Sequence, residues 1–209
     1  MRTGRSKASV FSGTFSILTI SPDFRLMGVA VASGSTHIGD RVPHAKPGIG
    51  VIATQAYTNI NYGIKGLKLM EKGFTPKKAL KTLLTEDPER NVRQVAIMDF
   101  KGKKTTFTGA NAPEYHAEAI GKNYIVIGNL LSSKDVVYHM AKHFESSSGD
   151  LAWKMAWALK AGSESGGDKR GEKSAALITV GIEKVEVKIK VAAHKNSIEE
   201  LFRRLKLHS

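Results

Sequence analysis

The sequence predicts an α+β fold: a four-layer αββα sandwich, in which two stacked antiparallel sheets lie between helical layers. One observation is the order of the expected elements, which runs strands, helix pair, strands, helix pair, strands, helix. Repeated βαβ units would alternate strand and helix instead. The second observation is the continuous apolar run Ile49-Gly50-Val51-Ile52-Ala53-Thr54, which is typical of a strand covered on both faces.

Turn and capping residues divide the first half of the chain into elements. Ser21-Pro22-Asp23 separates the first two strands, and Phe100-Lys101-Gly102-Lys103 joins a later hairpin. Thr75-Pro76 supplies a helix cap followed by a proline at the first helical position. The expected elements are strands Thr14–Ile20, Leu26–Ser33 and Ile49–Thr54, helices Tyr62–Glu71 and Thr75–Leu84, and strands Val92–Asp99 and Lys104–Thr108.

The second half continues with a short inner strand, two helices with one apolar face each, and a final hairpin and helix. A polar, Gly-rich loop over Ser165–Lys173 leads into the last hairpin. A capping box from Ser197 to Glu200 marks the start of the last helix. The expected elements are strand Tyr124–Ile127, helices Ser133–Phe144 and Asp150–Lys160, strands Ser174–Ile182 and Val185–Val191, and a helix from Ser197.

Length and composition bound the domain organisation. The 209 residues suit one domain, expected over residues 14–209 after a leader or propeptide over residues 1–13. The chain has no cysteine, which excludes disulfides, thiolate nucleophiles and Cys-ligated metal sites. No run reaches the roughly 18 apolar residues of a membrane span, and the leader lacks the apolar centre of a secretory signal. We therefore expect a soluble protein of the cytoplasm, without a membrane partner.

The net charge of +13 raises the question of nucleic-acid binding. The excess lysines are spread along the chain and mixed with acidic residues, without an arginine-rich block or a basic strand interleaved with aromatics. Solvated lysine faces explain this pattern better than a nucleic-acid site does. A nucleic-acid partner is therefore the less favoured interpretation of the charge.

Thr14 is the first candidate catalytic residue, because it opens the first core strand directly after the leader. If the chain were cleaved after Gly13, the hydroxyl of Thr14 and its own α-amine would form a nucleophile and base in one residue. Gly13 favours such self-cleavage, since a residue without Cβ can bring its carbonyl onto the threonine hydroxyl. The alternative is an ordinary strand threonine after an ordinary glycine.

Polar residues at the ends of other predicted elements are candidates for the same site. Backbone N–H groups of Gln55 and Ala56, at the end of a buried strand, can stabilise a tetrahedral oxyanion. Gln55 and Asn59 can bind substrate amides, although Asn59 can equally cap the following helix. A metal site is not expected, because His139 and His143, four apart on a helix, lack the HExxH pattern.

Two later segments supply further candidates for binding the substrate. Asn129 follows the inner strand Tyr124–Ile127, and Asp168 and Arg170 lie in the Gly-rich loop. The carboxylate and the guanidinium suit a substrate's amine and carboxylate respectively. The alternative is a Gly-rich turn stabilised by a salt bridge.

Several segments, in order, resemble the domain-of-unknown-function family 1028. The similarity extends from Thr14 to His208 and is specific because many motifs coincide. It implies a branch of the N-terminal nucleophile hydrolases, with the αββα sandwich, no cofactor, and subunits that often associate into homo-oligomers. The segments are Thr14–Ile17, Gly28–Ser33, Gly48–Ala56, Gly166–Gly171 and Ser174–Leu177.

The resemblance adds a role for Lys46 and shows departures. Proteasome-like relatives carry a lysine at similar spacing after the threonine, where an ammonium favours the alkoxide and lowers the pKa of the amine. The alternative is a solvated loop lysine. In that case Arg41 and His44 are the next candidates for the same role. Members usually have Met directly before the threonine, so here either the start lies downstream or residues 1–13 are a propeptide. Lys173 replaces the usual Gln, and Ala192-Ala193 replaces an acidic pair.

Together these observations predict a threonine-nucleophile amidohydrolase that acts on a small amide or peptide. Thr14 would be nucleophile and base, with Lys46 tuning it. The alternatives are a non-catalytic binding protein with the same fold and a basic nucleic-acid-binding protein.

Overall fold

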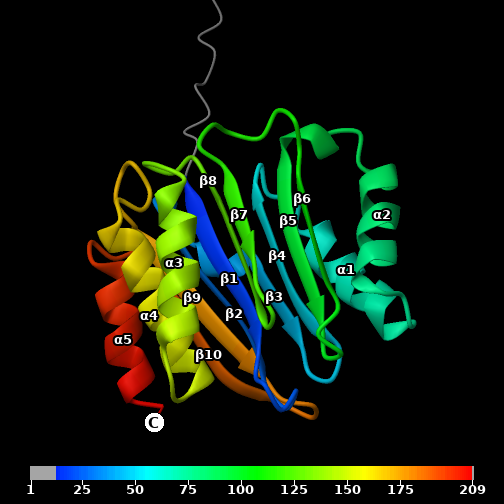
Figure 1. Cartoon of the computed structure of the whole chain (residues 1–209). Helices are drawn as coiled ribbons and strands as arrows, with labels where there is room; N and C mark the ends of the chain where they lie inside the picture. Colours follow the sequence, from blue (N-terminus) through cyan, green and yellow to red (C-terminus); the bar gives the residue numbers. More distant parts are fainter. Residues whose placement is uncertain (1–12, 209) are drawn as a thin grey trace, which may run out of the picture.

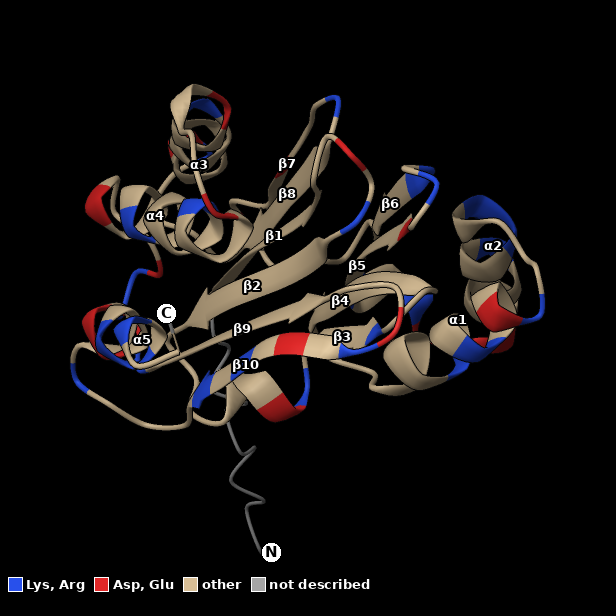
Figure 2. Ribbon diagram, turned by 90° about the horizontal axis from the view of Figure 1, so that it is seen from below, with Lys and Arg blue, Asp and Glu red and all other residues tan. Residues whose placement is uncertain are grey.

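The computed structural model describes residues 13–208, which form two stacked antiparallel sheets between two layers of helices (Figure 1). This architecture confirms the predicted α+β sandwich. Viewed from below, helices lie on the outer side of each sheet, and Lys and Arg are spread over both helical layers (Figure 2). The leader predicted over residues 1–13 falls, apart from Gly13, outside the described residues.

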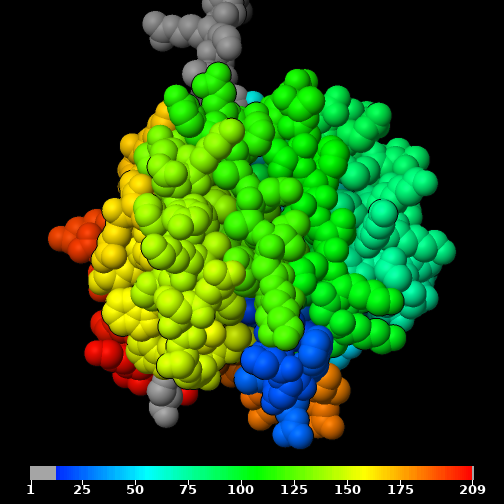
Figure 3. Space-filling view, viewed as in Figure 1, coloured from blue at the N-terminus to red at the C-terminus, as the bar shows by residue number. Residues whose placement is uncertain are grey.

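The larger sheet has six strands in the order β10-β9-β2-β1-β8-β7, so the N-terminal strand β1 lies in its middle. All seven residues of β1 are buried. In the space-filling view, later segments cover β1, and little of the first hairpin besides its turn reaches this surface (Figure 3). The strands are β1 (Thr14–Ile20), β2 (Met27–Ser33), β7 (Ala117–Ile120), β8 (Tyr124–Asn129), β9 (Ser174–Val180) and β10 (Val185–Val191).

The smaller sheet has four strands in the order β3-β4-β5-β6. Strand β4 is central and almost fully buried, as its continuous apolar run predicts. The strands are β3 (Pro43–Lys46), β4 (Gly50–Ala56), β5 (Arg93–Asp99) and β6 (Lys104–Thr108).

Helices α1 and α2 pack on the smaller sheet, and α3, α4 and α5 pack on the larger one. Among the helices of residues 13–208, none is long and apolar enough to cross a bilayer. The α-helices are α1 (Asn61–Glu71), α2 (Pro76–Glu86), α3 (Asp135–Ser146), α4 (Leu151–Glu164) and α5 (Ser197–Lys206), and the short 3-10 helices are η1 (Ile38–Asp40) and η2 (Arg90–Val92).

Three apolar clusters fill the spaces between the four layers. Strand β1 contributes to two of them, because successive side chains of a strand point to opposite faces. Phe15 and Ile17 pack toward α3 and α4, whereas Leu18 and Ile20 lie in the cluster between the two sheets. A strand buried on both faces therefore needs apolar residues at nearly every position.

Local sequence patterns predicted some caps and strands correctly and others wrongly. Thr75 caps α2 as predicted, with its side chain accepting from the Lys78 N–H. The capping box predicted at Ser197 is wrong: Glu200 pairs with Arg203 and Arg204 instead, and the Ser197 hydroxyl donates to the Glu172 carbonyl. Strands β3 and β7 were also not predicted.

Candidate active site

Polar side chains replace apolar ones where the inner faces of the two sheets meet at one end. In the larger sheet, Thr14 lies opposite Ser33 on β2 and opposite Asn129 on β8. In the smaller sheet, Gln55 lies opposite Gln94. All five residues are buried, and hydrogen bonds join the two sheets here. The sequence reveals no comparable buried polar group, because its members come from five separate strands.

The hydroxyl of Thr14 is linked to the peptide bond that precedes it. Thr14 Oγ1 lies 3.0 Å from Ser33 Oγ, and Ser33 Oγ donates to the carbonyl oxygen of Gly13 at 2.6 Å. A serine hydroxyl has one hydrogen, so with that hydrogen on the Gly13 carbonyl, Thr14 is the donor to Ser33. One serine thus contacts both the candidate nucleophile and the carbonyl of the Gly13–Thr14 bond.

Two glutamines connect Thr14 to the second sheet. Gln55 Nε2 donates to the carbonyl oxygen of Thr14 at 3.2 Å and to Gln94 Oε1 at 2.8 Å. Ser16 Oγ donates to Gln55 Oε1 at 2.6 Å, and Gln94 Nε2 donates to the Gly128 carbonyl at 3.0 Å. The bond to the Thr14 carbonyl holds its backbone, and the other bonds hold the two glutamines in position. Gln55 therefore contributes to the site through its side chain, and the oxyanion role of its N–H stays a prediction.

Asp168 lies against the backbone that precedes Thr14. Its carboxylate accepts from the Gly34 N–H at 2.7 Å and from Arg170 Nη2 at 2.9 Å. A Cβ placed on Gly13 would lie 2.4 Å from the Leu130 carbonyl oxygen and 2.8 Å from the Asp168 carboxylate. Asp168 and Arg170 are paired with each other, so the geometry matches the turn-and-salt-bridge alternative while Asp168 lies beside Gly13.

Two non-glycine residues near this end adopt left-handed backbone conformations. Ala56, the last residue of β4, has φ 67°, and Leu130, directly after Asn129, has φ 49°. Such conformations cost free energy in residues with a Cβ and are found preferentially at functional sites. Ala56 consequently remains a candidate for the predicted oxyanion donor.

The loop after Ala56 is anchored by a buried ion pair. Arg93 Nε donates to Asp87 Oδ2 at 2.9 Å, and Arg93 Nη1 donates to the Tyr57 carbonyl at 2.8 Å. Burial alone would raise the pKa of Asp87, but hydrogen bonds from Arg93 and from the Glu89 N–H hold this pKa below its usual value. The ionised pair therefore braces the end of β4.

Lys46 is not brought to Thr14, which corrects the role predicted for it. It pairs with Gly50 at the start of β4, five residues from Gln55, or roughly 16 Å along the strand. Its ammonium lies 2.6 Å from Glu71 on α1. The similar spacing in the sequence is misleading, because β3 and β4 form a hairpin whose turn places Lys46 at the opposite end of the sheet.

Asn59 bonds to β4 and to the start of α1. Its side chain accepts from the Asn61 N–H at 3.1 Å and its carbonyl accepts from Thr54 Oγ1 at 3.2 Å. The N-cap of α1 is Ile60, and Asn59 binds the first N–H of the helix from one residue before it. His44, one of the next candidates for the role of Lys46, packs its ring against Gly63 of α1, and burial lowers its pKa.

Sequence reasoning missed Ser16, Ser33 and Gln94. For two of them the sequence holds a signal, the alternation of side chains along a strand. Ser16 follows Thr14 by two residues and so shares its face, and Ser33 ends the strand that pairs with β1. Within residues 13–208, no group of three or more His, Asp or Glu is arranged to hold a metal ion.

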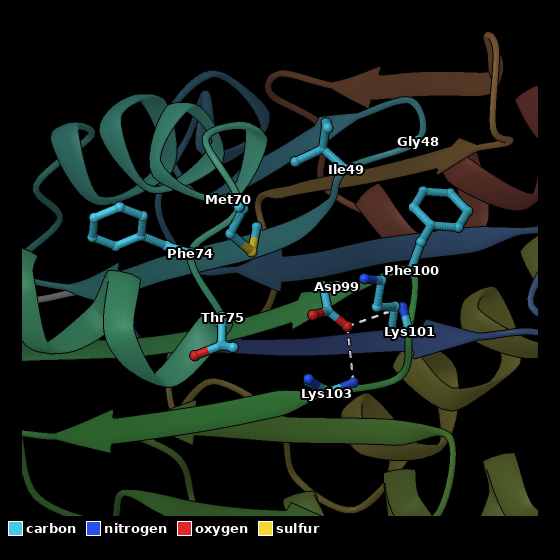
Figure 4. A pocket seen from close by; sticks show the side chains of 10 residues that line it. Gly48, Ile49, Met70, Phe74, Thr75, Asp99, Phe100, Lys101 and Lys103 are labelled. Atoms are coloured by element: carbon cyan, nitrogen blue, oxygen red, sulfur yellow. Dashed lines mark hydrogen bonds between the residues drawn. The ribbon is translucent and has the colours of Figure 1, made fainter.

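A cavity of about 200 Å³ lies at the opposite end of the smaller sheet (Figure 4). Met70, Phe74 and Phe100 give it an apolar lining, and Asp99 accepts from the backbone N–H groups of Lys101 and Lys103. Asp99 pairs with Gly50, whereas Gln55 and Gln94 pair near Thr14. The length of β4 and β5 therefore separates this cavity from the candidate active site.

Comparisons with known proteins support one assignment. Among solved structures, a protein from Silicibacter pomeroyi of family DUF1028 superposes with a TM-score of 0.87 at 27% identity, covering 93% of this chain and 85% of that chain. Anbu, an ancestral beta-subunit from Yersinia bercovieri, covers 92% of this chain and 93% of that chain, at 8% identity. Its TM-score of 0.46 supports no conclusion. A search of curated proteins found no match.

The family model described as a family of unknown function, DUF1028, matches residues 14–201. The match begins at Thr14, the first residue of β1, and includes the strands that carry Ser33, Gln55, Gln94 and Asn129. This chain belongs to the DUF1028 family.

Proposed function

We propose that this protein is an N-terminal nucleophile hydrolase that cleaves itself between Gly13 and Thr14 and then hydrolyses an amide bond in a small amide or peptide. The observation that carries the proposal is the position of Ser33 Oγ, 3.0 Å from Thr14 Oγ1 and 2.6 Å from the Gly13 carbonyl oxygen. The four-layer architecture and the sequence resemblance support the same class.

Self-cleavage would begin with attack of Thr14 Oγ1 on the carbonyl carbon of Gly13. Ser33 donates to the carbonyl oxygen, where negative charge develops, and so acts as an oxyanion donor. The hydroxyl proton passes to the amide nitrogen, the C–N bond breaks, and Gly13 becomes an ester on Thr14. Water then hydrolyses the ester, which leaves a carboxylate on Gly13 and frees both the hydroxyl and the α-amine of Thr14.

Turnover would use the same two groups. The free α-amine accepts the hydroxyl proton while Oγ1 attacks the substrate carbonyl, and the protonated amine then supplies the proton to the leaving nitrogen. The resulting ester is hydrolysed by water. Asp168, whose carboxylate lies against Gly13, would stabilise the positive charge on this amine. Gln55 holds the Thr14 carbonyl and keeps the nucleophile in position.

Intact mass and N-terminal sequencing of the purified full chain test the proposal. We expect the wild-type protein to begin at Thr14 and to gain the mass of one β-lactone probe on that residue. Thr14→Ala should keep residues 1–13 and remain unlabelled. Thr19→Ala, a change of the same residue type on the same strand, should be cleaved and labelled like wild type.

A wild-type chain that keeps residues 1–13 after prolonged incubation would instead favour a non-catalytic binding protein. Labelling that persists in Thr14→Ala would exclude Thr14 as the nucleophile. The two measurements therefore separate a processed enzyme from a fold that never frees its threonine.

A further inference from the structure

We infer that Asn129 Oδ1 selects substrates whose acyl group carries an N–H donor, such as N-acylated amino acids and peptides, over simple acyl amides. This inference rests on the proposed function and assigns a substrate class to the same site. The observation that supports it is Asn129 Oδ1 itself, a buried acceptor next to the nucleophile that receives no hydrogen bond from residues 13–208.

The orientation of the Asn129 amide follows from its neighbours. Ser16 and the Thr14 carbonyl fix the orientation of Gln55, whose Nε2 then donates to Gln94 Oε1. The Gly128 carbonyl fixes the orientation of the Gln94 amide as well, because only Nε2 can donate to a carbonyl oxygen. Gln94 Oε1 therefore faces Gln55 and Asn129. Asn129 must therefore present Nδ2 to Gln94 Oε1, at 3.1 Å, and its Oδ1 is left as the acceptor.

Two other acceptors near Thr14 already receive hydrogen bonds from the protein. The Thr14 carbonyl accepts from Gln55, and the Asp168 carboxylate accepts from Gly34 and Arg170. Asn129 is fully buried, yet its Oδ1 has no hydrogen-bond partner in the described part of the chain. A buried acceptor without a donor is costly, so a ligand that supplies the donor gains affinity.

The position of Asn129 makes the acyl group of the substrate the natural source of that donor. Asn129 lies directly opposite Thr14, and paired residues point to the same face with Cα atoms about 5 Å apart. An acyl group attached to Thr14 Oγ1 therefore lies beside Asn129. Cleavage after Gly13 would also free the space that Gly13 occupies between Leu130 and Asp168.

A matched pair of β-lactone probes tests the inference. One probe carries a secondary acylamino N–H on the carbon next to the lactone carbonyl, and the other is methylated on that nitrogen. The second-order rate of Thr14 acylation is followed by intact mass. We expect the N–H probe to react roughly tenfold faster with wild type, the size expected for one hydrogen bond to a buried group.

Two variants assign the preference to Asn129. Asn129→Leu keeps the shape but removes the acceptor, so the two rates should become equal. Asn129→Ala also removes the acceptor and should equalise the two rates as well, so it serves if the leucine variant does not fold. Each variant's fold is checked by thermal unfolding.

The outcomes separate the two proposals. Equal rates in wild type, or an undiminished preference in folded Asn129→Leu, overturn the inference while labelling of Thr14 still supports the hydrolase. If neither probe labels wild-type Thr14, the proposed function fails and this inference fails with it.

Discussion

Ser33 and Thr14 lie opposite each other on paired strands, with their hydroxyl oxygens 3.0 Å apart. Ser33 also donates to the carbonyl oxygen of Gly13. A single buried hydroxyl therefore links the candidate nucleophile to the bond that must be cleaved to free its α-amine.

The first prediction concerns Ser33. Ser33→Ala should slow cleavage after Gly13 by about 100-fold, because the developing oxyanion loses one preorganised donor. Appearance of the Thr14 terminus is measured by intact mass over time after rapid purification. Ser33→Thr retains the hydroxyl and should restore most of the rate; cleavage of the alanine variant at the wild-type rate would contradict the role.

The second prediction concerns Gly13, which has no room for a side chain. In the uncleaved Thr14→Ala background, Gly13→Ala should lower the free energy of unfolding by about 1–3 kcal/mol, because its Cβ meets the Leu130 backbone oxygen and Asp168. Thermal unfolding measures the change. Gly66→Ala in α1 is the control, since its Cβ meets the end of the Ile52 side chain, which can move, and alanine favours the helix. Equal losses from both changes would count against the prediction.

The third prediction concerns the amide pair between the sheets. Gln55→Leu and Gln94→Leu should each lower the free energy of unfolding by about 1–3 kcal/mol, because each leaves the buried hydrogen-bond partners of the replaced amide unpaired. The double variant should cost less than the sum of the two. Chemical denaturation of the three variants gives the coupling, and strict additivity would show that the two amides act independently.

The fourth prediction concerns acid stability. Asp87→Asn should cost about 3 kcal/mol at pH 7, because it leaves Arg93 buried without its main partner. The pKa of Asp87 in the folded protein lies below the ordinary 3.8, so the stabilisation is present above that pH and is lost as pH falls through the folded pKa. The difference between wild type and variant should accordingly shrink below about pH 4, as urea titrations across this range will show.

Glu89, the exposed second partner of Arg93, provides the control for that titration. Glu89 also contacts Arg93, at 2.8 Å, but its side chain is 74% exposed. Glu89→Gln should cost less than about 1 kcal/mol at pH 7. A larger cost for Glu89→Gln than for Asp87→Asn would overturn this account of the pair.

The fifth prediction concerns Lys46. Lys46→Ala should leave the rate of self-cleavage and the rate of Thr14 acylation within about twofold of wild type, because its ammonium pairs with Glu71 at the other end of β4. Both rates are followed by intact mass. A loss of 100-fold would imply an arrangement of β3 different from the one described.

The sequence by itself determined the type of most elements and the face that each residue occupies. The apolar run of β4, the turn at Ser21-Pro22-Asp23 and the cap at Thr75 are local patterns, and local patterns act wherever the chain is placed. Thr14 was singled out for its position at the start of a strand. Local rules failed where packing overrode them, as at Ser197, whose hydroxyl is used by a loop distant in sequence.

Only the tertiary structure decided which strand ends meet. Period-two alternation assigns a residue to a face, but the pairing of β1 with β8 joins residues more than a hundred positions apart and depends on the packing of whole layers. That packing places Ser33, Gln94 and Asn129 near Thr14. Lys46 lies at the opposite end of β4, although it is closer to Thr14 in the chain than Gln94 is. Distance along a chain that folds back at every hairpin does not measure distance in space.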